Sequence, residues 1–330
     1  MPQSKIQYQA GLSLTQFTEQ YGTESQCEAA LERARWPEGF RCPRCEGAHY
    51  GVIHDRRRKR YQCKNCRHQT TLTAGTVFEA TKLALTIWFQ AIYMISQAKT
   101  GLSALALKRQ LGVSYPTSWM IHHKLMHAMQ QRDDHYLLGG LVQIDDAYLG
   151  GELSGGKAGR GSENKVPFVA AVEFNEKRRP IRMRMSRVNG FTTRAISSWA
   201  QNHVADGTTV ITDGLACFAG VTEAGCKHIA KITGGRKPKE LPLFQWLNTI
   251  LGNVKTGIGG AYHAFLFSNY SYRCLAEVSY GFNRRFILKT LHQRLLMAAV
   301  GGLPTMPRAA PAFCGVFLLI RLRFASFSLL

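Results

Sequence analysis

Four cysteines stand in two pairs whose spacing suits a metal ion. Two residues separate Cys42 from Cys45 and Cys63 from Cys66, and 17 residues lie between the pairs. Two intervening residues let one tight turn present both thiolates to a tetrahedral ion, and the second pair closes the shell. The pattern predicts a structural Zn²⁺ site, because four sulfur ligands leave no open position for catalysis.

Two acidic residues follow apolar, strand-like runs. Asp145 comes after residues 140–144, and Asp213 comes after residues 208–212. A carboxylate beside a core is costly unless a cation compensates its charge. Mg²⁺ prefers oxygen ligands, and two such ions can promote phosphodiester chemistry. The pair therefore indicates a hard-metal site, although acids at strand ends also form turns and helix caps.

The second half of the chain contains the elements that must position these acids. Strand-like and helical segments follow one another in the order strand, strand, strand, helix, strand, helix. This order is typical of a mixed α/β domain. The strands are expected at 140–144, 166–172, 181–185 and 208–212, with a helix at 195–203 and a glycine-rich basic loop at 154–165.

The first half has helical periodicity on either side of the cysteines. Residues 12–37 and 83–97 carry apolar side chains at helical spacing. Residues 102–111 and 115–127 form two short helical segments around a glycine turn at 112–114, which resembles a helix-turn-helix. We expect the second helix to contact DNA, although many helix pairs with a glycine turn do not.

A large excess of positive charge favours a polyanionic partner. The chain has 42 Lys and Arg against 21 Asp and Glu, which gives a formal net charge of +21. Nucleic acid is the commonest such partner, because cations near phosphates release condensed counterions. Between the cysteine pairs, Arg56, Arg57, Arg58, Lys59 and Arg60 form a run that predicts DNA contact or, alternatively, a solvated basic turn.

Cysteine usage and the chain ends indicate the compartment. Nine cysteines are an odd number, and the first residues lack a signal-peptide pattern, which favours a reducing cytoplasm. Arg321 and Arg323 interrupt the apolar stretch at 312–330, so we predict no membrane span there.

Several segments, taken in order, resemble the DDE-type insertion-sequence transposases that carry an N-terminal zinc ribbon. They are VQIDDAYLGG at 142–151, ITDG at 211–214, NTILGNVKTGIGGAYHAF at 248–265 and YGFNRRF at 280–286. The likeness runs from the cysteine pairs to about residue 296, and motifs in a shared order are more specific than any one motif. It implies an RNase H-like α/β catalytic domain.

The resemblance assigns roles to single residues. Asp145 takes the place of the first catalytic Asp and Asp213 that of the second. Neighbouring strand residues point to opposite faces, so Asp146 is expected beside the metal site and not in it.

The third catalytic position departs from the usual Glu, since no acid stands in residues 241–259. Asn248 is our assignment, because Lys255 follows seven residues later on the same helical face, as in the family. Asn253 is the alternative ligand, and Asn248 could instead cap a helix. The resemblance also implies DNA contacts for Lys255, Arg284 and Arg285, the last two of which could equally lie at an exposed helix end.

The sequence thus predicts an α/β protein with an N-terminal zinc ribbon and helix-turn-helix, followed by an RNase H-like mixed-sheet catalytic domain. Its expected parts are a helical lead-in (1–37), the zinc ribbon (38–75), a helix-turn-helix region (76–135), the catalytic domain (136–300) and an atypical apolar tail (301–330).

The expected function is that of a transposase. It would bind the terminal inverted repeats and, with Zn²⁺ for structure and Mg²⁺ or Mn²⁺ for catalysis, cleave DNA and transfer strands. Its expected partners are double-stranded DNA and further copies of the chain, as a homodimer or higher multimer, in a bacterial cytoplasm near the nucleoid. A non-enzymatic DNA-binding regulator and an inactive transposase relic are the alternatives.

Overall fold

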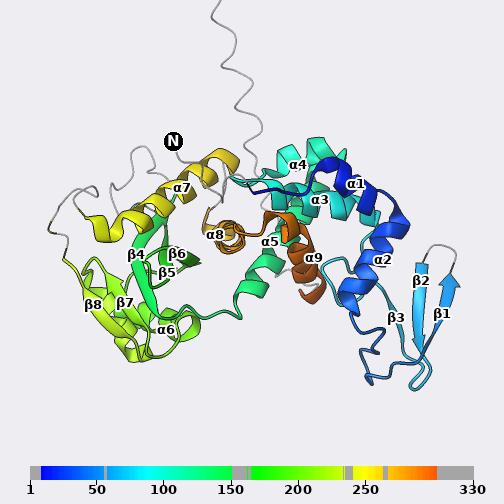
Figure 1. The fold of residues 1–330 in the computed structure, drawn as a ribbon, viewed down its shortest axis with the longest axis horizontal. Helices are drawn as coiled ribbons and strands as arrows, with labels where there is room; N and C mark the ends of the chain where they lie inside the picture. The colour runs from blue at the N-terminus through cyan, green and yellow to red at the C-terminus, as the bar shows by residue number, and fades with distance from the viewer. Residues whose placement is uncertain are drawn as a thin grey trace, which may run out of the picture.

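The computed structural model describes residues 9–55, 58–150, 162, 165–232, 234, 241–262 and 267–302 (Figure 1). Arg56, Arg57, most of the predicted glycine-rich loop and the predicted apolar tail from residue 303 lie outside these ranges. Within the described residues, none of the helices combines the length and apolar character that a membrane span requires.

Two capped helices lead into a small antiparallel sheet. The elements are α1 (Leu14–Tyr21), α2 (Glu24–Arg35), β1 (Tyr50–Asp55), β2 (Arg58–Cys63) and β3 (Gln69–Thr71), and the strands pair in the order β1-β2-β3. Ser13 and Thr23 begin the two helices with capping boxes. The rings of Trp36, Phe40 and Tyr61 pack together and join the sheet to the end of α2. This confirms the helical prediction for residues 12–37.

A group of helices forms the middle of the molecule. It comprises α3 (Leu85–Gln97), α4 (Ala104–Leu111), α5 (Tyr115–Asp133) and α9 (Leu291–Gly301), after the short 3-10 helix η5 (Leu288–Thr290). Gly112 ends α4 with φ 66°, a left-handed conformation that suits glycine. α9 packs against α2, α3 and α5, so the last described helix belongs to the core of the first half of the chain.

The second half contains a mixed five-stranded sheet. Its strands are β4 (Leu141–Leu149), β5 (Val166–Phe174), β6 (Pro180–Arg187), β7 (Thr209–Thr212) and β8 (Lys227–Ala230). The order is β6-β5-β4-β7-β8, with β4, β7 and β8 parallel and β5 antiparallel to both neighbours. This is the RNase H-like arrangement that the resemblance implied. The edge strand β8 was not predicted, since it is only four residues long and mostly exposed.

Helices cover both faces of this sheet. α7 (Gln245–Ala261), preceded by the 3-10 helix η4 (Pro242–Phe244), shares one core with α8 (Phe267–Asn283). α6 (Thr193–His203) and the 3-10 helix η2 (Ala216–Ala224) share another core on the opposite face. The five-stranded sheet lies at one end of the molecule and the three-stranded sheet at the other, with the helical group between them (Figure 1).

Candidate functional site

The four predicted zinc ligands converge at one end of the small sheet. Their sulfur atoms all lie within 4.8 Å of one another, and Cys42–Cys66 and Cys45–Cys63 are each 3.6 Å apart. A tetrahedral shell with Zn–S bonds of about 2.3 Å requires sulfur–sulfur separations of about 3.8 Å. The geometry and chemistry of the donor set therefore fit a structural zinc ion.

The two cysteine turns have the same backbone construction. The amide of Glu46 donates to the carbonyl of Cys42 (2.9 Å), and the amide of Arg67 donates to that of Cys63 (3.1 Å). Both Glu46 and Arg67 have φ 59°, a left-handed conformation that is uncommon for residues other than glycine. Each turn thus closes tightly behind its second thiol, as a pair of zinc knuckles requires.

Sheet register brings Asp145 and Asp213 together. In the parallel pairing of β4 with β7, Leu141 aligns with Thr209 and Gln143 with Ile211. The same offset places Asp213, directly after β7, opposite Asp145 on the α7 side of the sheet. Asp145 lies inside β4, whereas the sequence pattern suggested that it follows the strand. Because β4 extends past the end of β7, the part of β4 that contains Asp145 is not paired with β7, and its edge is open on that side.

Asp146 belongs to the same cluster. Carboxylate oxygens of Asp145, Asp146 and Asp213 lie within 4.8 Å of one another. Side-chain alternation led us to expect Asp146 beside the metal site and not in it, but its carboxylate lies in the same cluster as the other two. Strand alternation governs the direction of Cβ, but a carboxylate at an open strand edge can turn back toward its neighbour. The amide of Asp146 also donates to a carboxylate oxygen of Asp145 (2.9 Å), which keeps the adjacent side chain close.

The acidic cluster lies in the wall of a cavity of about 850 Å³. α7 contributes Lys255, Ile258 and Gly259 at helical spacing, and Tyr262, which directly follows the helix, lines the same cavity. Lys165 supplies a second basic group to the lining. The cavity therefore has carboxylates on one side and two ammonium groups on others, which suits metal ions together with a phosphate-bearing substrate.

Burial, followed by the charges of Asp146 and Asp213, raises the pKa of Asp145 from 3.8 to about 7. The nearby ammonium of Lys255 opposes this effect only in part. Three carboxylates so close together repel one another, and a bound divalent cation would relieve that repulsion. The donor set is all oxygen, so it fits Mg²⁺ or Mn²⁺.

We expect this pKa to make stability fall with pH when no metal is bound. Below pH 3.8 Asp145 is protonated in both states, and as the pH rises the unfolded chain releases its proton first. Between about pH 4 and 7 the free energy of unfolding therefore falls, in total by about 1.4 kcal/mol for each unit by which the pKa of Asp145 is raised. Denaturant unfolding in chelator should show Asp145→Asn to be a few kcal/mol more stable than the wild type at pH 7.5, with little difference at pH 4.

Adding Mn²⁺ at pH 7.5 should stabilise the wild type more than Asp145→Asn. Parallel pH profiles for the two proteins would contradict the raised pKa of Asp145.

Asn248 and Asn253 both lie on α7, and neither lines the cavity. Asn248 is half-buried in the first turn and precedes Lys255 by two turns on the same face. The residue that precedes α7 as its N-cap is Phe244, so the helix-cap alternative for Asn248 is wrong. Asn248 remains our prediction for the third ligand.

The structure corrects the prediction that Arg284 contacts DNA. Its guanidinium is buried and pairs with Asp133 of α5 (2.6 Å), 151 positions earlier in the chain. Arg285 donates to the carbonyls of Phe282 (2.7 Å) and Ile181 (3.3 Å), and burial lowers its pKa to about 10. Both arginines therefore hold the end of α8 in place instead of forming an exposed basic surface.

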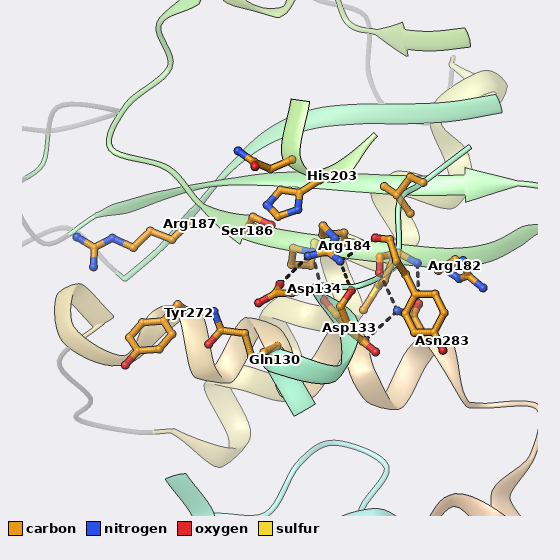
Figure 2. A pocket seen from close by; sticks show the side chains of 17 residues that line it. Gln130, Asp133, Asp134, Arg182, Arg184, Ser186, Arg187, His203, Tyr272 and Asn283 are labelled. Carbon is orange, nitrogen blue, oxygen red and sulfur yellow. Dashed lines mark hydrogen bonds and ion pairs between the residues drawn. The ribbon is translucent and has the colours of Figure 1, made fainter. Parts of the chain in front are cut away.

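Figure 2 shows the joint next to this arginine pair. Asp133 and Asp134 at the end of α5 contact Arg184 of β6 and Asn283 of α8, and all four line a cavity of about 430 Å³. Arg184 pairs with Asp134 (3.0 Å), and Asn283 donates to Asp133 (3.3 Å) and bonds to the backbone of Met183. These polar contacts fix the helical group against the edge of the five-stranded sheet.

The basic run of the ribbon is only partly exposed. Lys59 pairs with Glu32 of α2 (3.3 Å) and lies over the ring of Tyr61, so it helps to attach the ribbon to the helices. Arg60 is exposed, and nothing is described for the side chain of Arg58. Exposed cations that sequence reasoning missed surround the cysteine turns, namely Arg41, Arg44, Lys64 and Arg67.

The predicted helix-turn-helix exposes little of its second helix. In α5 the exposed residues are Tyr115 and Pro116 in the first turn and Arg132 near the other end, because the rest packs between other helices. Lys108 and Arg109 in the last turn of α4 are exposed on the preceding helix. Any DNA contact by this motif must therefore use the end of α4 and the start of α5, and the spacing of basic residues in α4 could have indicated it.

Two protein families match this chain. Residues 22–69 match the transposase zinc-ribbon domain, and residues 137–283 match the ISXO2-like transposase domain. The first range contains all four cysteines, and the second contains the three clustered aspartates together with α7 and α8. Each match thus includes one of the two clusters that could hold a metal ion.

Individual relatives are more distant. An uncharacterised protein in the transposable element ISH50 of the archaeon Halobacterium salinarum is 29% identical over 214 residues, covering 59% of this chain and 69% of that protein. Two crystal structures of Mos1, the strand transfer complex and the paired-end complex with Mn, share 12% and 11% identity. They cover 64% of this chain and 77% and 78% of theirs, and their TM-scores of 0.24 and 0.23 are too low to support a structural argument.

Proposed function

Because this chain carries an ISXO2-like transposase domain behind a transposase zinc ribbon, we propose that it binds the ends of a mobile DNA element and catalyses metal-dependent cleavage and strand transfer. The observation that carries the proposal is the cluster of Asp145, Asp146 and Asp213 within 4.8 Å, at the open edge of an RNase H-like sheet. A protein that only bound DNA would have no need to gather mutually repelling carboxylates at a cavity wall.

The residues around the cavity have different proposed roles. The three aspartates, with Asn248 as a further ligand from α7, would hold two Mg²⁺ or Mn²⁺ ions, which when bound activate water and stabilise the leaving oxygen of a phosphodiester. Lys255 and Lys165 face the same space and would bind the phosphates of the DNA strand. We assign no Ser or Tyr nucleophile, because the freed 3′-hydroxyl can attack target DNA directly.

We further propose that the exposed cations of the ribbon and of α4 bind the DNA ends. Arg44, Lys64 and Arg67 surround the zinc knuckles, and Lys108 with Arg109 precede the exposed first turn of α5. Such a surface gives sequence-independent affinity through phosphates, while Tyr115 at the start of α5 can reach base edges. Because transposition joins two ends, we propose a homodimer or higher multimer on DNA in the cytoplasm.

Replacing Lys108 and Arg109 together with Ala should weaken DNA binding and its dependence on salt. Each lost phosphate contact lowers the slope of log K against log salt by about 0.9, so the double variant should lose about 2. Binding to a DNA fragment is measured at several salt concentrations. Lys177→Ala with Arg178→Ala, two exposed cations on the turn between β5 and β6, is the matched control. Equal slopes for the wild type and the α4 variant would contradict this interface.

The function itself is tested with purified protein and DNA that carries the ends of the element encoding the chain. We expect Mg²⁺- or Mn²⁺-dependent nicks that expose a 3′-hydroxyl at each end, followed by products joined to a target plasmid. Sequence-specific binding without any metal-dependent cleavage would instead support a DNA-binding regulator. Cleavage without dependence on divalent metal would contradict the proposed site.

A further inference from the structure

The second half of α7 is a helix that its own sequence disfavours. Gly257, Gly259 and Gly260 stand within its last five residues, and glycine in a helix interior costs about 1 kcal/mol relative to alanine. A Cβ at Gly257 would lie 3.4 Å from the carbonyl oxygen of Thr100, but one at Gly259 or Gly260 would meet nothing within 4 Å. Packing around the helix must therefore supply the stability that the glycines remove.

Tyr262, which directly follows α7, makes a buried polar contact with two other helices. Its hydroxyl donates to the carboxylate of Glu277 in α8 and lies 3.5 Å from Nε2 of His122 in α5. The same His122 nitrogen lies 3.4 Å from the other carboxylate oxygen of Glu277. All three residues are buried, with exposed fractions of 8% for Tyr262, 7% for Glu277 and 1% for His122.

The charges around this contact make it costly to disturb. A buried carboxylate that loses a hydrogen bond is strongly unfavourable, because no water replaces the lost donor. Burial and the charge of Glu277 raise the pKa of Tyr262 well above its usual value, so its hydroxyl keeps a proton to donate. Arg273, one turn earlier on α8, is itself buried and interacts with His123 of α5 (3.0 Å), which places a compensating cation nearby.

The same tyrosine also reaches the catalytic cavity. Tyr262 and Lys255 both line the cavity, and they stand seven residues apart, with Tyr262 directly after the last two turns of α7. Lys255 is close enough to act electrostatically on Asp145. The position of the Lys255 ammonium therefore depends on the order of the glycine-rich helical turns between the two residues.

We propose that Tyr262, Glu277 and His122 form a clamp that fixes the end of α7 and so holds Lys255 beside Asp145 and Asp213. Tyr262 is thus a positioning residue for DNA cleavage and strand transfer. The effect of Tyr262 on catalysis rests on the function proposed above. Since His122 belongs to α5, the clamp ties the cavity to the helix whose first turn is exposed near the cations of α4.

Hydrogen exchange on the free protein tests the clamp without any reaction. In Tyr262→Phe, which keeps the ring and removes the hydroxyl, amides 257–262 should exchange at least about tenfold faster than in the wild type. The matched control is Tyr280→Phe on α8, because Tyr280 is also buried and its hydroxyl has no hydrogen-bond partner among the described residues. Unchanged exchange of these amides in Tyr262→Phe, or equal changes in both variants, would overturn the clamp.

A double-mutant cycle tests the link to Lys255. Strand transfer by Tyr262→Phe should fall about tenfold or more, as expected for a displaced catalytic group, while Tyr280→Phe keeps wild-type activity. In a Lys255→Met background, Tyr262→Phe should cause little further loss, because both changes remove the same contribution. Fully additive losses would overturn the link. If the wild type shows no strand transfer on any end sequence, the proposed function fails, and hydrogen exchange still decides the clamp.

Discussion

Asp145→Asn and Asp213→Asn should each reduce metal-dependent strand transfer by at least about 10³-fold, which corresponds to about 4 kcal/mol of transition-state stabilisation. The two side chains meet across the open edge between β4 and β7, where the sheet register places them opposite each other. Replacing either carboxylate with an amide keeps the shape of the side chain but removes a negative charge from a cluster of three. A cluster with fewer carboxylate charges binds divalent ions more weakly, so the phosphodiester lacks the metal ions that would stabilise its charge.

The assay follows strand transfer from labelled end DNA over a range of Mn²⁺ concentrations. Asp206→Asn is the matched control, because Asp206 is exposed on a loop and lies outside the cluster. DNA binding should persist in all three variants, and in the absence of metal it should be slightly stronger where a cavity carboxylate is lost. Activity within tenfold of the wild type for both Asp145→Asn and Asp213→Asn would rule out this cluster as the catalytic site.

Asp146→Asn distinguishes the sequence-based role of Asp146 from its observed place. A residue that only flanks the site would tolerate the change, whereas a member of the three-carboxylate cluster should lower apparent Mn²⁺ affinity. The structure favours the second outcome, because the Asp146 oxygen lies within 4.8 Å of those of Asp145 and Asp213.

Loss of zinc should unfold the ribbon and remove its share of DNA binding. Cys42→Ser leaves three sulfur ligands, and structural zinc sites of this type contribute about 10–16 kcal/mol of apparent binding energy that is also folding energy. The ribbon has a sheet of only three strands, so a zinc ion would supply much of the stability that holds the knuckles closed. We expect the variant to bind no zinc, and its affinity for DNA to fall on the order of tenfold or more, since several phosphate contacts are lost together.

Zinc content by metal analysis, together with DNA binding at fixed salt, measures this effect. Cys226→Ser is the matched control, because Cys226 is buried in a different core and is not part of either metal-binding cluster. The five-stranded sheet has its own cores, so its unfolding transition should be unchanged in Cys42→Ser. A variant that lost zinc but kept wild-type DNA affinity would show that the ribbon makes no contribution to binding.

Local spacing is what the sequence by itself determined. The two cysteine pairs are recognisable because ligands two residues apart share one turn, and that turn has the same form wherever it occurs. Asp145 and Asp213 could be selected because each follows an apolar run, and parallel strands bring the ends of such runs to one edge. Periodicity predicted the helices at 83–97, 102–111, 115–127 and 195–203 and most strands for the same short-range reason, whereas α8 and α9 were not predicted.

Only the tertiary structure decided which polar groups face solvent and which face each other. Arg284 looked like a DNA contact until its partner proved to be Asp133, 151 positions earlier. Asp146 joined the cluster because β7 stops pairing at Ile211 and leaves the edge of β4 open. The contact of Tyr262 with Glu277 and His122 unites three helices. Burial and pairing depend on residues far away in the chain, and no local pattern encodes which of them will meet.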